Sequence, residues 1–336
     1  MDTTGTLDEA LGRLHTSGPE RGGWLSNHGP MAVEALVRGG QASHVHRWLD
    51  HYRDKLEDMP APFAPVTAAN WHEALGDPRR IADWAAYFER EIAARPWREV
   101  LAEWWPRLLP GIAAGATHPV IRVGHAVRTL LDGGDSPTAP RLAELAHGLG
   151  YWAARHQPLP PLTSLPAAPS AEAALDAVPL VRQEGGIRDR LARLTGFPAW
   201  PDATGAEADP QARLTELVRA SVHRYATHAH GAPIMLVHAA TAPNAVLRTL
   251  PALPRTLWTP SLQAAWAASA AVTAAYAPST PAPYARTSLT GPELFERAAL
   301  HGDDHTIKFA DTALDVGDET ALDAALQAIA LNPPAL

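Results

Sequence analysis

Apolar residues recur every three or four positions along almost the whole chain, whereas alternation of apolar and polar residues is scarce. The clearest case lies between residues 81 and 92, where the apolar side chains share one helical face: Ile81, Trp84, Ala85, Phe88 and Ile92. This spacing matches the period of 3.6 residues of an α-helix, while a half-buried strand needs a period of two. The sequence therefore predicts an all-α fold.

The expected helices cover most of the chain and leave a few proline-dense connections between them. They span residues 30–39, 42–57, 78–94, 97–109, 118–131, 139–156, 169–194, 210–230, 243–250, 260–275, 292–313 and 318–330, and the apolar run 234–237 is also assigned as helical. Closely spaced prolines lie in residues 158–166, 198–210 and 278–283, and they end helices because proline lacks an N–H group and fixes φ. We interpret these stretches as surface connections within a single large multi-helix domain over residues 1–336, because the motifs below lie on both sides of them.

The composition excludes several classes of protein and partner. The net charge is -8 and no run of Lys or Arg forms a basic stripe, so neither nucleic acid nor a membrane surface is expected as a partner. The absence of cysteine removes disulfides, thiolate zinc sites, iron–sulfur clusters and a thiol nucleophile. Neither a signal peptide nor a run of about 18 apolar residues is found, so a soluble cytoplasmic protein is expected. No dinucleotide, Walker, nucleophile-elbow or H-E-x-x-H motif is found either.

Without cysteine, any metal must be held by histidine, a carboxylate or an unusual ligand, and sixteen histidines are present. Five stand out because they lie at expected helix ends or beside small and apolar residues: His28, His118, His125, His238 and His305. Neutral imidazole is the commonest metal ligand, and helices often deliver ligands into a bundle core. Such a set suits iron, manganese or zinc. A single buried histidine is more often a hydrogen-bonded core residue, and His118 and His125 lie about 10.5 Å apart along one helical face, so the ligand set stays open.

Lys308 needs a separate interpretation, because a protonated amine has no lone pair and cannot bind a cation. Its ordinary role would be an i,i+4 ion pair with Asp304. Alternatively, burial and a nearby metal lower its pKa, and the neutral amine takes up carbon dioxide to become a carbamate, an anionic oxygen ligand. His301, four residues before His305, is a reserve ligand, although Gly302 weakens the case for a continuous helix between them.

Four blocks of the sequence resemble those of questin oxidase-like proteins: residues 26–36, 96–108, 115–128 and 303–308. The resemblance implies an enzyme of secondary metabolism that uses O2 to open a ring of an anthraquinone or a related polyketide. Such a step is known both as an NADPH-linked, Baeyer–Villiger-type oxidation and as an iron-dependent dioxygenation. The metal-dependent form also implies a histidine site with a carboxylated lysine.

By matching positions, the resemblance assigns the metal to one set of residues: His28, His118, His125, His238, His305 and Lys308. His125 and Arg122 are also the expected catalytic residues, which would steady a developing oxyanion. Pro119 follows His118 where the family is expected to have glycine, and this changes how His118 is presented. The expected cofactor is iron, with manganese or zinc as alternatives, and O2 is the co-substrate. A small polycyclic aromatic substrate is expected, while NADPH and a reductase that reduces the quinone are left open.

Two other functions remain compatible with the same residues. A carbamylated lysine and histidines also generate a metal-bound hydroxide in hydrolases, so a metal-dependent hydrolase is one alternative. A helical protein that binds an aromatic ligand without catalysis is the other, with the histidines as hydrogen-bonded core residues. The identity and the amount of bound metal distinguish these functions from the oxygenase.

Overall fold

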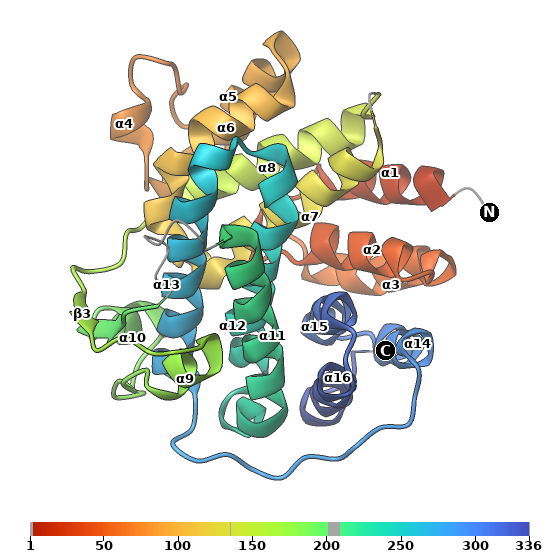
Figure 1. Cartoon of the computed structure of the whole chain (residues 1–336). Helices are drawn as coiled ribbons and strands as arrows, with labels where there is room; N and C mark the ends of the chain where they lie inside the picture. Colours follow the sequence, from red (N-terminus) through yellow and green to blue (C-terminus); the bar gives the residue numbers. More distant parts are fainter. Residues whose placement is uncertain (1–2, 135, 201–208, 336) are drawn as a thin grey trace. The chain divides into compact units, whose positions relative to one another are not determined.

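The computed structural model describes residues 3–134, 136–200 and 209–335, and helices dominate these ranges (Figure 1). The predicted all-α fold is thereby confirmed. Within the described ranges the named strands form only two small pairs, β1 (Glu20–Arg21) with β2 (Leu25–Ser26), antiparallel, and β3 (Thr163–Leu165) with β4 (Gly196–Pro198), parallel. None of the described helices combines the length and the apolar character needed to cross a membrane.

The contacts between residues divide the chain into two compact units. Unit 1 comprises Met1–Gln157 and Arg248–Pro254, and unit 2 comprises Pro158–Leu247 and Arg255–Leu336. The chain therefore passes from one unit to the other three times. A single domain over residues 1–336 stays a prediction.

Unit 1 contains most of the N-terminal helices. Its α-helices are α1 (Thr3–Leu14), α2 (Gly29–Arg38), α3 (Val45–Tyr52), α4 (Trp71–Ala74), α5 (Ile81–Ala94), α6 (Trp97–Leu108), α7 (His118–Asp132) and α8 (Ala139–Arg155). Short 3-10 turns lie between them or in the returning segment: η1 (Ala42–His44), η2 (Arg53–Lys55), η3 (Pro78–Arg80), η4 (Leu109–Gly111), η5 (Ala114–Thr117) and η7 (Leu250–Ala252).

The packing of unit 1 follows the apolar face that the sequence predicts for α5. Trp84 and Phe88 are fully buried and meet Trp104 of α6 edge-to-face, with ring centroids 5.4 and 5.0 Å apart. Removing these rings from water is the main stabilising effect, and the edge-to-face geometry adds to it. Helix α8 approaches α5 closely at Gly150, where a β-carbon would lie 2.8 Å from the backbone nitrogen of Ala85. A larger residue at position 150 would therefore push these helices apart.

Unit 2 contains the longer C-terminal helices. Its α-helices are α9 (Ala171–Asp176), α10 (Ile187–Leu191), α11 (Pro210–His228), α12 (Pro233–Thr249, whose last two residues belong to unit 1), α13 (Trp258–Tyr276), α14 (Gly291–His301), α15 (Asp304–Val316) and α16 (Glu319–Leu331). The 3-10 turns η6 (Ala229–Gly231) and η8 (Arg255–Leu257) precede α12 and α13. Helix α11 packs against α13, α15 and α16.

A proline lies inside α12 and is compensated by a neighbouring helix. Pro243 has no N–H group, so the carbonyl of Ala239, four residues earlier, loses its helical partner. The hydroxyl of Ser269 in α13 donates a hydrogen bond to this carbonyl at 2.8 Å, and Ser269 is fully buried. The freed carbonyl is therefore satisfied without water.

Ser269→Ala should lower the free energy of unfolding by about 1–3 kcal/mol, because it leaves the buried Ala239 carbonyl without this donor. Ser261→Ala in the same helix is the matched control. Ser261 is equally buried, but its hydroxyl donates to Leu257 O, a carbonyl in the preceding turn that no proline has deprived of its helical N–H partner. Urea denaturation of both variants tests the prediction, and equal losses would contradict it.

Several predicted helix boundaries are wrong. The predicted helix 292–313 is two helices, because Gly302 has a left-handed φ of 77° and ends α14 before Asp303 caps α15. The predicted helix 169–194 exists only near its ends, as α9 and α10. Pro179 and Gly185, which has a φ of 80°, lie between these two short helices.

Other predictions of secondary structure stand or need extension. The helix predicted at 243–250 is the end of the longer α12, which also contains the run 234–237, so the helical assignment of that run is confirmed. Helix α1 was not predicted, although the buried residues Leu7, Leu11 and Leu14 have helical spacing. The proline-rich connections 158–166 and 278–283 contain no buried residue, which confirms their place on the surface. Within the third connection, residues 201–208 lie outside the described part of the chain.

Candidate metal centre

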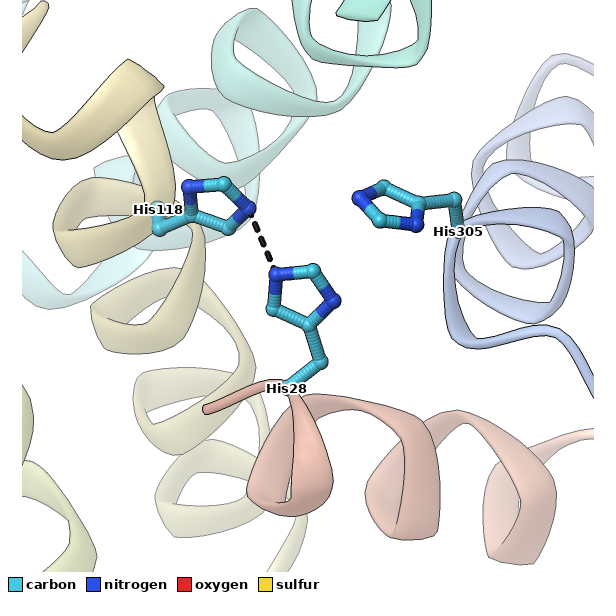
Figure 2. Close-up of side chains that lie close together, drawn as sticks. All are labelled: His28, His118 and His305. Carbon is cyan, nitrogen blue, oxygen red and sulfur yellow. Dashed lines mark hydrogen bonds between the residues drawn. The ribbon is translucent and has the colours of Figure 1, made fainter. Parts of the chain in front are cut away.

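Two of the candidate histidines meet directly in unit 1. His28 immediately precedes α2, where the Asn27 side chain accepts a hydrogen bond from Gly29 N at 2.9 Å and the His28 N–H donates to the Tyr52 hydroxyl at 2.7 Å. His118 is the first residue of α7. The Nε2 atoms of His28 and His118 lie 2.7 Å apart and the rings stack with centroids 4.5 Å apart (Figure 2). Two histidines that are 90 residues apart in the sequence thus form a buried imidazole pair.

A left-handed turn directly before α7 presents His118. Gly115, Ala116 and Thr117 all have positive φ, at 53°, 55° and 67°. This region costs an L-residue about 1–2 kcal/mol, and a β-branched residue such as Thr117 is rare there. The turn brings the Gly115 carbonyl to His118 Nδ1, which donates to it at 2.6 Å. Strained backbone of this kind is concentrated at functional sites.

Ala116→Gly should be tolerated better than the same substitution at Ala126, a buried position inside α7. Glycine adopts the left-handed φ of position 116 without strain, which offsets the backbone entropy it adds to the unfolded chain. At position 126 glycine only weakens the helix. We expect the loss of unfolding free energy to be smaller at position 116 by about 1–2 kcal/mol, measured by chemical denaturation. Equal losses would mean that the turn is not strained.

His28 and His118 share a proton between their Nε2 atoms, and a metal ion could take the place of this proton. A carbonyl only accepts, so His118 Nδ1 carries a proton, and in the neutral ring Nε2 accepts from His28 Nε2. A tetrahedral ion with metal–nitrogen distances of about 2.0–2.1 Å separates two ligand nitrogens by about 3.4 Å. The rings, now 2.7 Å apart, would need to separate by only about 0.7 Å to exchange the shared proton for an ion.

His125 lies two turns further along α7 and belongs to a different buried cluster. Its Nδ1 donates to Glu34 Oε2 at 2.5 Å, and Arg128 Nε donates to Glu34 Oε1 at 2.8 Å. Burial raises the pKa of Glu34, but the charges of Arg128 and His125 outweigh it and lower the pKa to about 2. Burial also lowers the pKa of His125. The cluster is therefore an ionised carboxylate beside an imidazole whose Nδ1 is occupied.

Unit 2 brings together two further candidates. His238 lies inside α12 rather than at the start of a helix, and it is fully buried. His305 lies in the first turn of α15, and the two rings form a T-shaped contact with centroids 5.6 Å apart. His238 Nδ1 donates to Met235 O at 3.0 Å, and His305 Nδ1 lies 2.8 Å from Asp304 Oδ1 in an ion pair. Asp303, Asp304 and His305 each offer a ligand atom, and these atoms lie within 4.8 Å of one another.

Lys308 lies one turn beyond His305, with only 1% of its surface exposed. Its Nζ has no hydrogen-bond partner among the described residues, so it makes no hydrogen bond to Asp304, although the charge of Asp304 still acts on it. Burial lowers the pKa of Lys308 to about 8, although the charges of Asp304 and Asp303 act in the opposite direction. Burial likewise lowers the pKa of His305, but Asp304 and Asp303 outweigh it and raise that pKa overall. An amine in this position can lose its proton near neutral pH.

One feature is common to His118, His125, His238 and His305: Nδ1 contacts a protein oxygen. The acceptors are Gly115 O for His118, Glu34 for His125, Met235 O for His238 and Asp304 for His305. An acceptor at Nδ1 fixes the tautomer in which Nε2 carries the lone pair, and metal-binding histidines are typically held in this way. The donor set of these residues therefore fits a metal ion bound through Nε2.

Two other predicted residues have different surroundings. The Arg122 guanidinium donates to both carboxylate oxygens of Glu144, at 2.6 and 2.8 Å, so its contacts are those of a buried ion pair, and its catalytic role stays a prediction. His301, the reserve ligand, ends α14 and its Nε2 donates to Asn332 O at 3.1 Å. The left-handed Gly302 separates it from the helix of His305.

The acceptors at Nδ1 were missed from the sequence. Glu34 lies in the otherwise apolar run 31–36, and a carboxylate there needs a buried partner. The sequence predicts Asp304 only as a partner of Lys308, although it adjoins His305. Arg128 follows His125 by three residues on α7 and thus lies on the same helical face. A buried charge on an apolar helix face was the signal that could have found this cluster.

Comparison with known proteins gives one family. Residues 25–173 match the family model described as Questin oxidase-like, which confirms the resemblance for the three sequence blocks that lie in this range, and the block 303–308 lies outside it. This stretch contains His28, His118 and His125, whereas His238, His305 and Lys308 follow it. The family name implies an oxidoreductase, and more specifically an oxygenase of polyketide metabolism. No curated protein matches the chain.

Proposed function

We propose that the protein is a metal-dependent oxygenase that opens a ring of an anthraquinone-like or other polycyclic aromatic polyketide. The observation that carries this proposal is that Nδ1 of His118, His125, His238 and His305 contacts a protein oxygen, so that Nε2 is the ligand atom expected in each ring. The family match over residues 25–173 supports the oxygenase class.

The residues proposed to hold the metal are those of the sequence prediction: His28, His118, His125, His238, His305 and Lys308. Imidazole nitrogens and an anionic oxygen suit non-heme iron, with manganese or zinc as alternatives. Iron, when bound, would supply the redox chemistry that allows O2 to react with an electron-rich ring.

The chain's own residues have three tasks in this proposal. The imidazoles bind through Nε2, while Glu34 and Asp304 hold the protons of Nδ1 on His125 and His305. The burial of His28 and His118 keeps bulk water from the site and strengthens the electrostatic interactions there. His125 and Arg122 remain the proposed catalytic residues for a developing oxyanion.

Lys308 is proposed to be carbamylated. Its neutral amine would attack carbon dioxide, forming an N–C bond and releasing one proton, so that an anionic oxygen replaces a cation beside the metal. Two observations support this: Nζ is buried with no hydrogen-bond partner in the described part of the chain, and its pKa is lowered to about 8.

Added bicarbonate should then increase metal loading, and Lys308→Glu should keep more metal than Lys308→Ala.

The test is metal analysis of the purified protein together with oxidation of a reduced hydroxyanthraquinone under 18O2. We expect stoichiometric iron and incorporation of two labelled oxygen atoms into a ring-opened product, without consumption of NADPH. One labelled oxygen with consumption of NADPH and no metal would instead identify a Baeyer–Villiger-type oxidation. A need for NADPH only to reduce the quinone would point to a partner reductase.

A metal-dependent hydrolase is the second candidate, favoured by the surroundings of Lys308 alone. A carbamate and histidines also lower the pKa of a bound water. Stoichiometric zinc and no uptake of O2 would support the hydrolase and contradict the oxygenase. Protein purified without metal, which binds the aromatic ligand but does not change it, would contradict both.

A further inference from the structure

We infer that Glu34 is a positioning residue of the proposed metal centre: clamped by Arg128, its carboxylate holds His125 in the tautomer that offers Nε2 to the metal. The inference rests on the proposed function for the metal itself. The hydrogen bonding of His125 within unit 1 does not depend on that function and can be measured separately.

The geometry leaves His125 little choice of tautomer. Glu34 Oε2 lies 2.5 Å from His125 Nδ1, whereas Arg128 Nη2, which can only donate, lies 3.4 Å from the same nitrogen. An ionised carboxylate only accepts, so the much shorter contact to Glu34 places the proton on Nδ1. Arg128 fixes the carboxylate itself, because its Nε donates to Oε1 at 2.8 Å and its Nη2 donates to Oε2. The three side chains are each at least 94% buried, so water cannot replace any of these hydrogen bonds without a large cost in free energy.

A second cluster in the same unit shows that burial of a carboxylate, an arginine and a histidine does not by itself produce this orientation. Both carboxylate oxygens of Glu144 accept hydrogen bonds from Arg122, and Glu144 Oε2 also lies 3.1 Å from Nε2 of His15. That contact occupies Nε2 of His15, whereas Glu34 occupies Nδ1 of His125. The two carboxylates therefore bind opposite ring nitrogens, and Glu34 does not occupy Nε2 of His125.

An alternative is that Glu34 and Arg128 are only a buried ion pair that stabilises α2 against α7. Both interpretations predict a loss of stability when Glu34 is replaced, so stability cannot separate them. The link between tautomer and metal affinity can, because under the purely structural interpretation a change in the tautomer of His125 would leave the metal affinity unchanged.

The experiment uses the full chain and 15N-histidine NMR of the metal-free protein, with the His125 signals assigned by their loss in His125→Gln. We expect wild-type His125 as a single Nδ1–H tautomer. In Glu34→Leu/Arg128→Met, which removes the acceptor without leaving a buried charge, the ring should revert to the tautomer mixture of free imidazole. The affinity for Fe(II) or Co(II), measured by titration, should fall by about 10- to 100-fold.

Glu144→Gln is the matched control, since Glu144 is a buried carboxylate with the same kinds of partner. It should leave both the His125 tautomer and the metal affinity unchanged. Glu34→Gln is the milder variant, because its amide oxygen still accepts from Nδ1, and it should keep the tautomer and most of the affinity.

Two results would overturn the inference: an unaltered Nδ1–H tautomer in Glu34→Leu/Arg128→Met, or an altered tautomer with unaltered metal affinity. If the wild-type protein binds no metal at all, the proposed function fails. The NMR result would still decide whether Glu34 sets the orientation of His125.

Discussion

Replacing His118 by alanine should lower metal affinity by at least about 100-fold and abolish O2 uptake. Loss of a hydrogen-bond partner outside the ligands already costs about 10- to 100-fold, so loss of a ligand should cost more. His118 also shares a proton with His28 at 2.7 Å, so the substitution leaves a buried ring without that partner, at about 1–3 kcal/mol. His118→Gln retains a hydrogen-bonding group near His28 and separates the loss of metal from a loss of stability.

The same measurement on His238→Ala extends the prediction to unit 2. Because the proposal takes ligands from both units, either variant should remove the same single ion from the protein. Two ions per chain, each lost in only one variant, would mean two separate centres.

Two histidines outside the proposed site serve as controls, the buried His147 in unit 1 and the half-buried His301 in unit 2. His147 binds Glu89 at 3.0 Å and His301 binds Asn332 O at 3.1 Å. His147→Ala and His301→Ala should keep full metal content in plasma emission spectrometry. Undiminished metal in His118→Ala and His238→Ala would place the centre elsewhere.

Replacing Lys308 by methionine should stabilise the metal-free protein by about 3 kcal/mol at pH 7 while removing its metal site. Methionine fills a similar volume without a buried amine. The pKa of Lys308 is lowered from 10.5 to about 8 in the folded protein, and each unit corresponds to about 1.4 kcal/mol. The substitution would thus exchange function for stability, as expected of a strained functional position.

The lowered pKa of Lys308 also predicts that the free energy of unfolding rises with pH. Below pH 8 both the folded and the unfolded chain hold the proton, and the folded protein has the full cost of a buried ammonium. Between about pH 8 and 10.5 only the unfolded chain holds it, so the free energy of unfolding rises with pH, and it levels off above 10.5. Lys308→Met should lack this rise.

Urea denaturation in EDTA and carbon-dioxide-free buffer, at several pH values between 7 and 10.5, measures the difference between wild type and Lys308→Met. Taking the difference cancels the titration of the other groups. A constant difference across this range would contradict a lowered pKa for Lys308. Stoichiometric metal in Lys308→Met would mean that the lysine is not a ligand, while the histidines would remain the proposed ligands.

The sequence was most informative where local spacing decides the structure. The buried face of α5 could be read from Ile81, Trp84 and Phe88, because helical period and burial agree there. The break at Gly302 was visible as a weak point but was not assigned as a helix end, since a glycine inside a helix costs only about 1 kcal/mol. In the structure its left-handed φ ends α14, and Asp303 caps the next helix directly after it.

The candidate site was predictable in its residue types and not in its pairings. The proximity of His28 and His118 depends on how α2 packs against α7, which no local spacing reveals. The turn before His118 illustrates a second limit. Gly115 suggests a left-handed φ, but nothing in Ala116 or Thr117 does, so tertiary contacts must impose it there. The role of the acceptors Glu34 and Asp304 follows from the same packing.

Because the chain passes between the two units three times, the protein cannot be divided into its units by a single cut in the sequence. A fragment that ends at Gln157, or one limited to the family match at residues 25–173, lacks η7, whose Leu250 is fully buried and which packs against α6. The latter fragment also lacks α1. Neither boundary therefore isolates a complete folding unit. An autonomous unit 1 would require residues 248–254 to be joined to residues 1–157 by a designed linker, and limited proteolysis in the exposed connection 158–166 should leave the two pieces associated.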